Sequence, residues 1–250
     1  MAGDFREAFQ STGNVAAYDE GQYAPGGYWD VLWQIEKEIL DSVMARLRTT
    51  KTVVRHLDFA CGTGRILAHL EPSCDESVGI DVSQVMLDVA RTRVRAARLL
   101  RVDIAAGEAA DEGGFDLVTA FRFVLNAEPS LRQAALKELV GRLRDRDSLL
   151  VVNNHGSLWS YKAALAPLKA LRDRVTGGRP ERLLSTRRMD TLLRDAGLDV
   201  LGQHGLGLLP GAVLERVPDK WRASVERSLR RLPGLASLGV NQIYVCRKAA

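Results

Sequence analysis

An apolar, strand-like run that ends in a glycine turn constrains this chain more than any other feature. Residues 52–60 read as a buried strand, the next four residues are Cys-Gly-Thr-Gly, and a helix-like stretch follows at 65–70. Gly62 and Gly64 allow a tight turn and let the backbone approach a ligand where a Cβ atom would collide. A strand–turn–helix unit of this kind predicts an α/β fold with a ligand site at the turn.

The same alternation of strand-like and helix-like stretches continues through most of the 250 residues. We expect strands at 52–60, 77–81, 98–103, 115–123, 148–154, 198–209 and 241–248, and helices at 28–47, 65–70, 83–96, 129–143, 157–175 and 185–197. Units of this length imply right-handed crossovers. The sequence therefore predicts a Rossmann-like, doubly wound, mainly parallel seven-stranded sheet with helices on both faces. We expect residues 1–50 to form an N-terminal helical cap and 51–250 the main domain, with an insertion at about 210–239.

Composition and charge narrow the range of partners and compartments. No apolar run approaches the roughly 20 residues that cross a bilayer, and the N-terminus has no apolar signal-peptide core, so we expect a cytoplasmic protein without membrane contact. The net charge is +4, but the basic residues are spread widely over helix-like stretches and read as solvated faces, which makes a nucleic-acid partner unlikely. The three cysteines and four histidines lack metal-ligand spacing, so we expect no metal site.

Acidic residues stand at the ends of the first two predicted strands. Asp58 ends the first, and Asp81 ends the second, nineteen residues after Gly62. A carboxylate at the second position can accept both hydroxyls of a ribose. A dinucleotide would also need a glycine three residues after Gly64 to seat its pyrophosphate, and Leu67 stands there. The pattern favours a nucleoside ligand without a pyrophosphate.

The run Asp-Phe-Ala-Cys-Gly-Thr-Gly-Arg, with an acid at the end of the next strand, resembles the class I S-adenosylmethionine-dependent methyltransferases. The resemblance covers residues 50–155 well and the last two strands more loosely, and it implies S-adenosylmethionine as the cofactor. It places the glycine motif with Ala60, Gly62 and Gly64 around the methionine part of the cofactor, near Asp58, and Asp81 on the ribose. It also implies Val82 and Met86 near the adenine, Asp103 with Ile104 at the adenine amino group, and Phe121 beside the reacting methyl.

Many relatives carry a Pro-Gly-Gly turn before the fifth strand, whereas this chain has charged residues at 144–147. The sequence leaves the conformation of that turn open. At the N-terminus, the segment with Tyr18 and Tyr23 and the helix that begins at Tyr28 are expected to fold over the cofactor as a cap. The alternative is a surface helix that covers the core.

The chemical class of the methyl acceptor is limited mainly by motifs that the sequence lacks. After the fourth strand there is neither the Asn/Asp-Pro-Pro-aromatic tetrad of the nucleobase-amine methylators nor the carboxylate of the metal-dependent catechol type. We therefore expect a small-molecule oxygen or nitrogen acceptor, walled in part by the insertion and its Trp221. The alternatives are an RNA or protein methyltransferase that uses the basic C-terminal helices, or a non-catalytic cofactor-binding module.

His155 follows the fifth strand and is the histidine best placed to act as general base, since an unperturbed imidazole titrates near neutral pH. The alternative is a histidine that bonds the loop backbone or only positions the acceptor.

Overall fold

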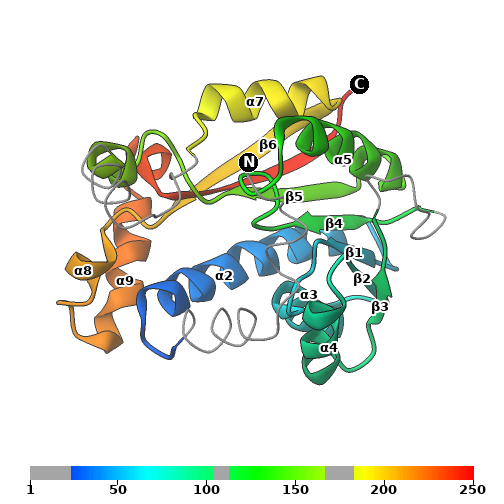
Figure 1. Cartoon of the computed structure of the whole chain (residues 1–250), viewed down its shortest axis with the longest axis horizontal. Helices are drawn as coiled ribbons and strands as arrows, with labels where there is room; N and C mark the ends of the chain where they lie inside the picture. The colour runs from blue at the N-terminus through cyan, green and yellow to red at the C-terminus, as the bar shows by residue number, and fades with distance from the viewer. Residues whose placement is uncertain (1–23, 104–112, 167–182) are drawn as a thin grey trace.

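A seven-stranded sheet forms the centre of the computed structural model, which describes residues 24–103, 113–166 and 183–250 (Figure 1). The strand order is β3-β2-β1-β4-β5-β7-β6. The strands are β1 (Arg55–Phe59), β2 (Glu76–Asp81), β3 (Arg98–Arg101), β4 (Leu117–Ala120), β5 (Leu149–Asn154), β6 (Leu198–Leu206) and β7 (Asn241–Lys248). The order reverses at β1 and β4, and the carboxyl ends of strands flanking such a reversal are where open α/β sheets bind ligands.

Five neighbouring strands, β3, β2, β1, β4 and β5, run parallel to one another, whereas β7 pairs antiparallel with both β5 and β6. Strands β1, β4 and β5 are almost wholly buried, as expected for a sheet covered on both faces. The predicted mainly parallel seven-stranded sheet is confirmed.

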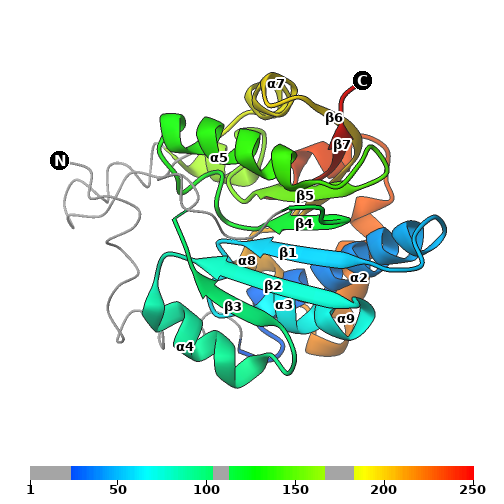
Figure 2. The ribbon, with the colours of Figure 1, turned by 90° about the vertical axis from the view of Figure 1, so that its right-hand side faces the viewer.

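Helices cover both faces of this sheet (Figure 2). One layer holds α2 (Tyr28–Arg48), α3 (Arg65–Leu70) and α4 (Gln84–Arg93), and the other holds α5 (Pro129–Arg142) and α7 (Thr186–Asp195). Ser83 and Ser185 cap α4 and α7, because each hydroxyl accepts a bond from a backbone N–H three residues on, at 3.3 Å. Pro129 occupies the first turn of α5, where its missing N–H costs nothing.

The N-terminal helix α2 is a layer of the core. Ten of its residues are buried, and they pack with apolar side chains of α3, β4, β5 and β7. Ile35 and Leu40 are fully inaccessible to solvent. This burial favours the alternative interpretation, a helix that covers the core, because a helix buried along its length cannot open without exposing the core. Tyr18 and Tyr23 lie outside the described residues.

The turn before β5 is built by an aspartate side chain in place of glycines. Asp145 Oδ1 accepts bonds from the backbone N–H groups of Asp147 and Ser148, both at 3.0 Å, and from the Ser148 hydroxyl at 2.9 Å. Lys51 forms an ion pair with the other oxygen of Asp145. Such side-chain bonds to the following backbone are an alternative way to close a turn.

The insertion between β6 and β7 packs beside α2. It contains α8 (Gly211–Leu214), α9 (Asp219–Arg230) and η4 (Leu235–Leu238). Helix α9 lies against α2, and Arg227 of α9 pairs with Glu38 of α2 at 2.5 Å. Across the three described ranges, no helix combines the length and the apolarity needed to span a bilayer.

Candidate functional site

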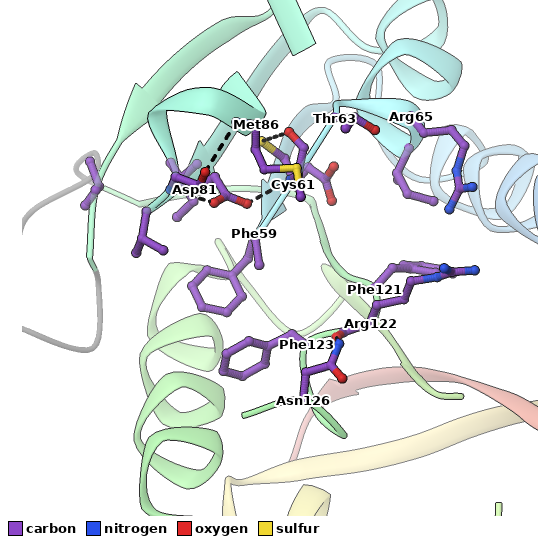
Figure 3. A pocket seen from close by; sticks show the side chains of 18 of the residues that line it. Phe59, Cys61, Thr63, Arg65, Asp81, Met86, Phe121, Arg122, Phe123 and Asn126 are labelled. Carbon is purple, nitrogen blue, oxygen red and sulfur yellow. Dashed lines mark hydrogen bonds between the residues drawn. The ribbon is translucent and has the colours of Figure 1, made fainter. Parts of the chain in front are cut away.

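A pocket opens at the carboxyl ends of β1, β2, β3 and β4 (Figure 3). It encloses about 1130 Å³ of space between protein atoms, part of it continuous with solvent. The lining residues are Asp58, Phe59, Ala60, Cys61, Gly62, Thr63, Arg65, Ile66, Ile80, Asp81, Val82, Ser83, Met86, Val102, Asp103, Phe121, Arg122, Phe123, Asn126 and Leu131. Most of the positions expected to bind the cofactor therefore share one pocket, although they come from four separate strand ends.

The two motif glycines have different structural roles. Both have left-handed backbones, with φ of 54° at Gly62 and 74° at Gly64. A Cβ atom on Gly62 would meet no atom within 4 Å, and Gly62 lines the pocket, so its backbone is open to a ligand. A Cβ atom on Gly64 would lie 2.9 Å from the Cβ of Ala90 in α4. Gly64 is absent from the pocket lining and serves the close packing of α3 on α4.

Asp81 links the glycine turn to the end of β2. Its Oδ2 accepts a bond from the Gly62 backbone N–H at 2.8 Å, and its Oδ1 accepts one from the Ser83 backbone N–H at 2.9 Å. Each carboxylate oxygen has two lone pairs, so both can still accept a bond from a hydroxyl group. Burial raises the pKa of Asp81, and the bonds from Ser83 and Gly62 oppose that shift.

Asp58 carries a buried oxygen that accepts no hydrogen bond from the described part of the chain. Its Oδ1 accepts a bond from the Thr119 hydroxyl at 2.6 Å, and the Thr119 oxygen is itself 2.9 Å from His56 Nε2. Its Oδ2 has no hydrogen-bond partner among the described residues. The Leu67 backbone N–H lies near enough to favour the ionised carboxylate without completing a bond to Oδ2. An unsatisfied buried carboxylate oxygen on a pocket wall suits a ligand that is a donor or a cation.

Burial raises the pKa of Asp58 to about 7, against the bond from Thr119. The nearby charge of Asp81 contributes to this rise. Asp58 is therefore partly protonated at neutral pH in the ligand-free protein, and a cationic ligand would favour its ionised form.

Of the remaining residues predicted to bind the cofactor or the acceptor, some line the pocket and others do not. Val82, Met86, Asp103 and Phe121 line the pocket, as does Ala60, whose φ of 52° is left-handed although it is not a glycine. Ile104 lies outside the described residues, like the two N-terminal tyrosines. No residue of the insertion lines the pocket, and the Trp221 side chain on α9 is 56% exposed. The lining of this pocket gives no support to the expectation that the insertion walls the acceptor site, which stays a prediction.

His155 lies outside the pocket lining and is a poor base. Its pKa is lowered to about 3, mainly by burial and also by the positive charges of Arg122 and Lys162. An imidazole with so low a pKa is neutral at pH 7 and takes up a proton reluctantly. The sequence-based prediction rested on an unperturbed pKa, whereas the main cause of the shift is burial of the ring, which the local sequence does not reveal.

Several pocket residues were not among the predicted cofactor positions. Arg122, Phe123 and Asn126 lie in the loop after β4, and Leu131 comes from the first turns of α5. The signal that could have found them is topological, since the loop after β4 also emerges at the switch point. Among the described residues, no cluster of three or more His, Cys, Asp or Glu side chains could hold a metal ion.

Residues 57–146 match the family described as a methyltransferase domain. A stretch of 39 residues, 16% of this chain, is 62% identical to an uncharacterized methyltransferase of Schizosaccharomyces pombe. That match spans 14% of the yeast protein.

Solved structures share the fold over nearly the whole chain. Magnesium protoporphyrin IX methyltransferase from Synechocystis, with bound S-adenosylhomocysteine, superposes with a TM-score of 0.63 at 17% identity, over 98% of this chain and 97% of that one. An S-adenosylmethionine-dependent methyltransferase from Clostridium acetobutylicum gives 0.63 at 13% identity, over 94% and 98%. The [4+2]-cyclase SpnF gives 0.60 at 18% identity, over 100% and 98%.

Proposed function

We propose that this chain is a class I S-adenosylmethionine-dependent methyltransferase and that it methylates an oxygen or nitrogen atom of a small molecule. When bound, the cofactor supplies a methyl group on a positively charged sulfur that is already activated for transfer. In such a transfer the acceptor's lone pair would bond to the methyl carbon, the carbon–sulfur electrons would stay on sulfur, and the acceptor would release its proton to solvent. The protein's main contribution is then to align the two reactants.

The residues at the strand ends fit this cofactor. Asp81 offers two oxygens to ribose hydroxyls, and Gly62 leaves its backbone open beside them. Asp58 presents an unsatisfied oxygen to the ammonium group of the methionine part. Val82 and Met86 supply apolar contacts for the adenine, and Asp103 an acceptor for its amino group. We assign no general base to the protein.

The observation that carries the small-molecule proposal is that the pocket continues past the cofactor residues into an aromatic and basic end. Phe121, Arg122 and Phe123 line this end after β4, and Arg65 lines it from α3 (Figure 3). A concave site with apolar walls and a few charged groups suits a small molecule. Among solved structures of this fold, one is a methyltransferase of the small molecule magnesium protoporphyrin IX.

The basic helix α9 offers little to an RNA partner. The side chain of Arg222 is only 13% exposed and donates bonds to the backbone oxygens of Gly26, Glu215 and Val217. Arg227 is paired with Glu38 of α2. These two arginines attach the insertion to the rest of the protein. The basic stretch therefore has a structural role, which argues against a role in binding phosphate groups of RNA.

The test uses the full chain and S-adenosylmethionine with a deuterated methyl group. Calorimetry first measures binding of the cofactor. The protein is then incubated with the small-molecule, RNA and protein fractions of a cell extract, and mass spectrometry locates the label. We expect label in the small-molecule fraction. Label confined to RNA or protein would overturn the proposed acceptor class, and binding without any transfer would favour the non-catalytic module.

A further inference from the structure

A histidine stands on a central strand, in the most buried part of the sheet. His56 on β1 has 0% exposure, and its register partners are Ser77 on β2 and Leu117 on β4. Strands that are covered on both faces consist mostly of apolar residues. An imidazole ring buried there costs free energy unless its nitrogens are hydrogen-bonded. Its presence on β1 is therefore better explained by a specific interaction than by packing.

The His56 ring makes its hydrogen bond through one nitrogen. Its Nε2 lies 2.9 Å from Thr119 Oγ1, whereas Nδ1 has no hydrogen-bond partner within residues 24–103, 113–166 and 183–250. Burial lowers the pKa of His56 to about 3, so the ring is neutral at pH 7. A neutral imidazole carries a single N–H, on one nitrogen or the other.

The Thr119 hydroxyl group determines which nitrogen carries that hydrogen. Thr119 Oγ1 donates to Asp58 Oδ1 at 2.6 Å, so its hydrogen is already used and its oxygen can act only as an acceptor towards His56. Nε2 of His56 is therefore the donor. The three side chains form one directed chain of hydrogen bonds, which runs from His56 through Thr119 to Asp58.

The pleat of two neighbouring strands brings these side chains together. His56 and Asp58 are two residues apart on β1, so they point to the same face of the sheet. Thr119 is the register partner of Asp58 on β4. All three residues are buried, but of the three only Asp58 lines the pocket. His56 and Thr119 therefore act on a ligand only through Asp58.

The chain ends on one oxygen of Asp58 and leaves the other without a hydrogen bond. A hydroxyl group that donates to a carboxylate stabilises its ionised form, and the Thr119 bond opposes the burial that raises the pKa of Asp58 to about 7. Because hydrogen bonds in a chain polarise one another, His56 strengthens the bond from Thr119. Oδ2 has no hydrogen-bond partner in the described part of the protein.

The charged and titratable groups around Asp58 come from several elements. Asp81 on β2 raises the pKa of Asp58, and the Leu67 backbone N–H of α3 lowers it. Burial raises the pKa of the Cys61 thiol well above its ordinary value, so this group is neutral. On the α2 side, Glu36 is buried and accepts a bond from Asn241. The remaining charged residues of the pocket lining are Arg65, Asp103 and Arg122.

We infer that His56 is a positioning residue, which acts through Thr119 to hold the Asp58 carboxylate so that Oδ2 can bind the ammonium group of S-adenosylmethionine. Neutral, directed hydrogen bonds from the interior of the sheet thus support an anion at the end of a buried strand. The inference rests on the proposed methyltransferase function, in which Asp58 binds that ammonium group.

The test compares two probes by calorimetry on the full chain. S-adenosylhomocysteine carries the ammonium group, whereas 5′-methylthioadenosine has the same adenosine part without it. Thr119→Val removes the hydroxyl group at nearly constant volume. We expect its affinity for S-adenosylhomocysteine to be at least about fivefold below wild type at pH 7. This loss should be at least about threefold smaller at pH 8.5, where Asp58 ionises more fully in both proteins, and 5′-methylthioadenosine affinity should not change.

Conservative variants separate the hydrogen bonds from the packing. Thr119→Ser keeps the hydroxyl group and should restore the affinity for S-adenosylhomocysteine. His56→Leu should weaken it in the same direction as Thr119→Val, and His56→Gln, whose amide N–H can donate to Thr119, should restore it. The matched control is Thr191→Val on the surface of α7, which should change neither affinity.

Nitrogen NMR of the wild-type protein tests the chain even if the buried variants fold poorly. His56, assigned through its backbone resonances, should carry its hydrogen on Nε2. A hydrogen on Nδ1 would overturn the inference, because Nε2 could not then donate to Thr119.

The remaining outcomes distinguish the inference from the proposed function. Unchanged S-adenosylhomocysteine affinity in Thr119→Val would overturn the inference. So would an equal loss for both probes, or an equal loss at both pH values, because Thr119 would then have a purely structural role. Failure of the wild-type protein to bind either probe would instead reject the proposed function.

Discussion

The Gly62 backbone N–H donates to Asp81 Oδ2 at 2.8 Å and so joins the turn after β1 to the carboxyl end of β2. One carboxylate both shapes the glycine turn and faces the pocket. Asp81→Ala removes its acceptors for two ribose hydroxyls, and bonds to a charged acceptor contribute about 1.5–3 kcal/mol each. We expect cofactor affinity measured by calorimetry to fall at least about a hundredfold.

The control for Asp81→Ala is Asp88→Ala, an aspartate on the same chain segment that pairs with Arg91 on the surface of α4. It should leave cofactor affinity unchanged. Wild-type affinity in Asp81→Ala would contradict the assignment of the ribose site to the end of β2.

Alanine substitutions at Gly62 and Gly64 should have different effects, one mainly on cofactor affinity and the other mainly on the free energy of unfolding. Gly62→Ala and Gly64→Ala both place a side chain at positive φ, at a cost of about 1–2 kcal/mol. Gly64→Ala also forces a contact with Ala90 and should lose about 1–3 kcal/mol more of the free energy of unfolding. Gly62→Ala meets no protein atom but projects a methyl group into the pocket. We expect denaturant titration to show the larger loss for Gly64→Ala, and calorimetry the larger loss of cofactor affinity for Gly62→Ala.

Identical profiles for the two variants, in both measurements, would mean that the glycines share one role. A Gly64→Ser variant provides a check on the steric explanation, since its additional atom should deepen the loss of stability.

The buried carboxyl group of Asp58 should make stability depend on pH. Its folded-state pKa of about 7 exceeds the 3.8 of an unperturbed aspartate, so the folded protein keeps a proton that the unfolded chain releases. The contribution of Asp58 to stability therefore falls as pH rises from about 4 to 7. Asn at position 58 can still accept the Thr119 bond but does not ionise, so the stability difference between Asp58→Asn and wild type should shift in favour of the variant across this window. Melting temperatures from pH 4 to 8 measure this difference, and a constant offset would contradict the assignment.

Binding of the cationic cofactor should also depend on the ionisation of Asp58, but its pH dependence should run in the opposite direction to that of stability. A positive charge near Asp58 favours the carboxylate, so cofactor affinity of the wild type should rise between pH 5 and 7. Asp58→Asn should bind more weakly and with a flatter pH dependence.

His155 should have no part in the pH dependence of catalysis near neutrality. Because its pKa is lowered to about 3, the ring stays neutral throughout pH 5 to 9. His155→Gln should therefore leave the shape of the kcat against pH profile unchanged, whatever its effect on stability. Loss of an acidic limb near pH 6.5 in this variant would restore the histidine as a general base.

The regular parts of the fold could be predicted because local signals and tertiary structure agree there. The apolar runs around β1 and β5, the serine caps of α4 and α7, and Pro129 at the start of α5 each specify an element within a few residues. The meeting of Asp58, Asp81 and Asp103 in one pocket follows from strand-end placement in a parallel sheet. These predictions needed no knowledge of long-range contacts.

The predictions that the structure does not support depended on how segments distant in the sequence pack together. The aromatic residues of α2 are equally compatible with a lid and with a core layer, and only the buried contacts of Ile35 and Leu40 with the sheet distinguish them. Trp221 is apolar in sequence and yet lies on the surface of α9. The left-handed backbone of Arg122, where φ is 58°, has no local signature, since it is imposed by Asn153 from a different strand.

The placement of β7 between β5 and β6 has a consequence for the order of assembly. Strand β6 hydrogen-bonds to the sheet through β7, so it stays without its partner until residues 241–248 have been synthesised. At a translation rate of roughly 5–20 residues per second, the interval from Leu206 to Asn241 lasts about 2 to 7 s. During that time the edges of both β5 and β6 are open to other chains. A nascent-chain chaperone that covers exposed strands for a few seconds would protect these two edges from pairing with other chains.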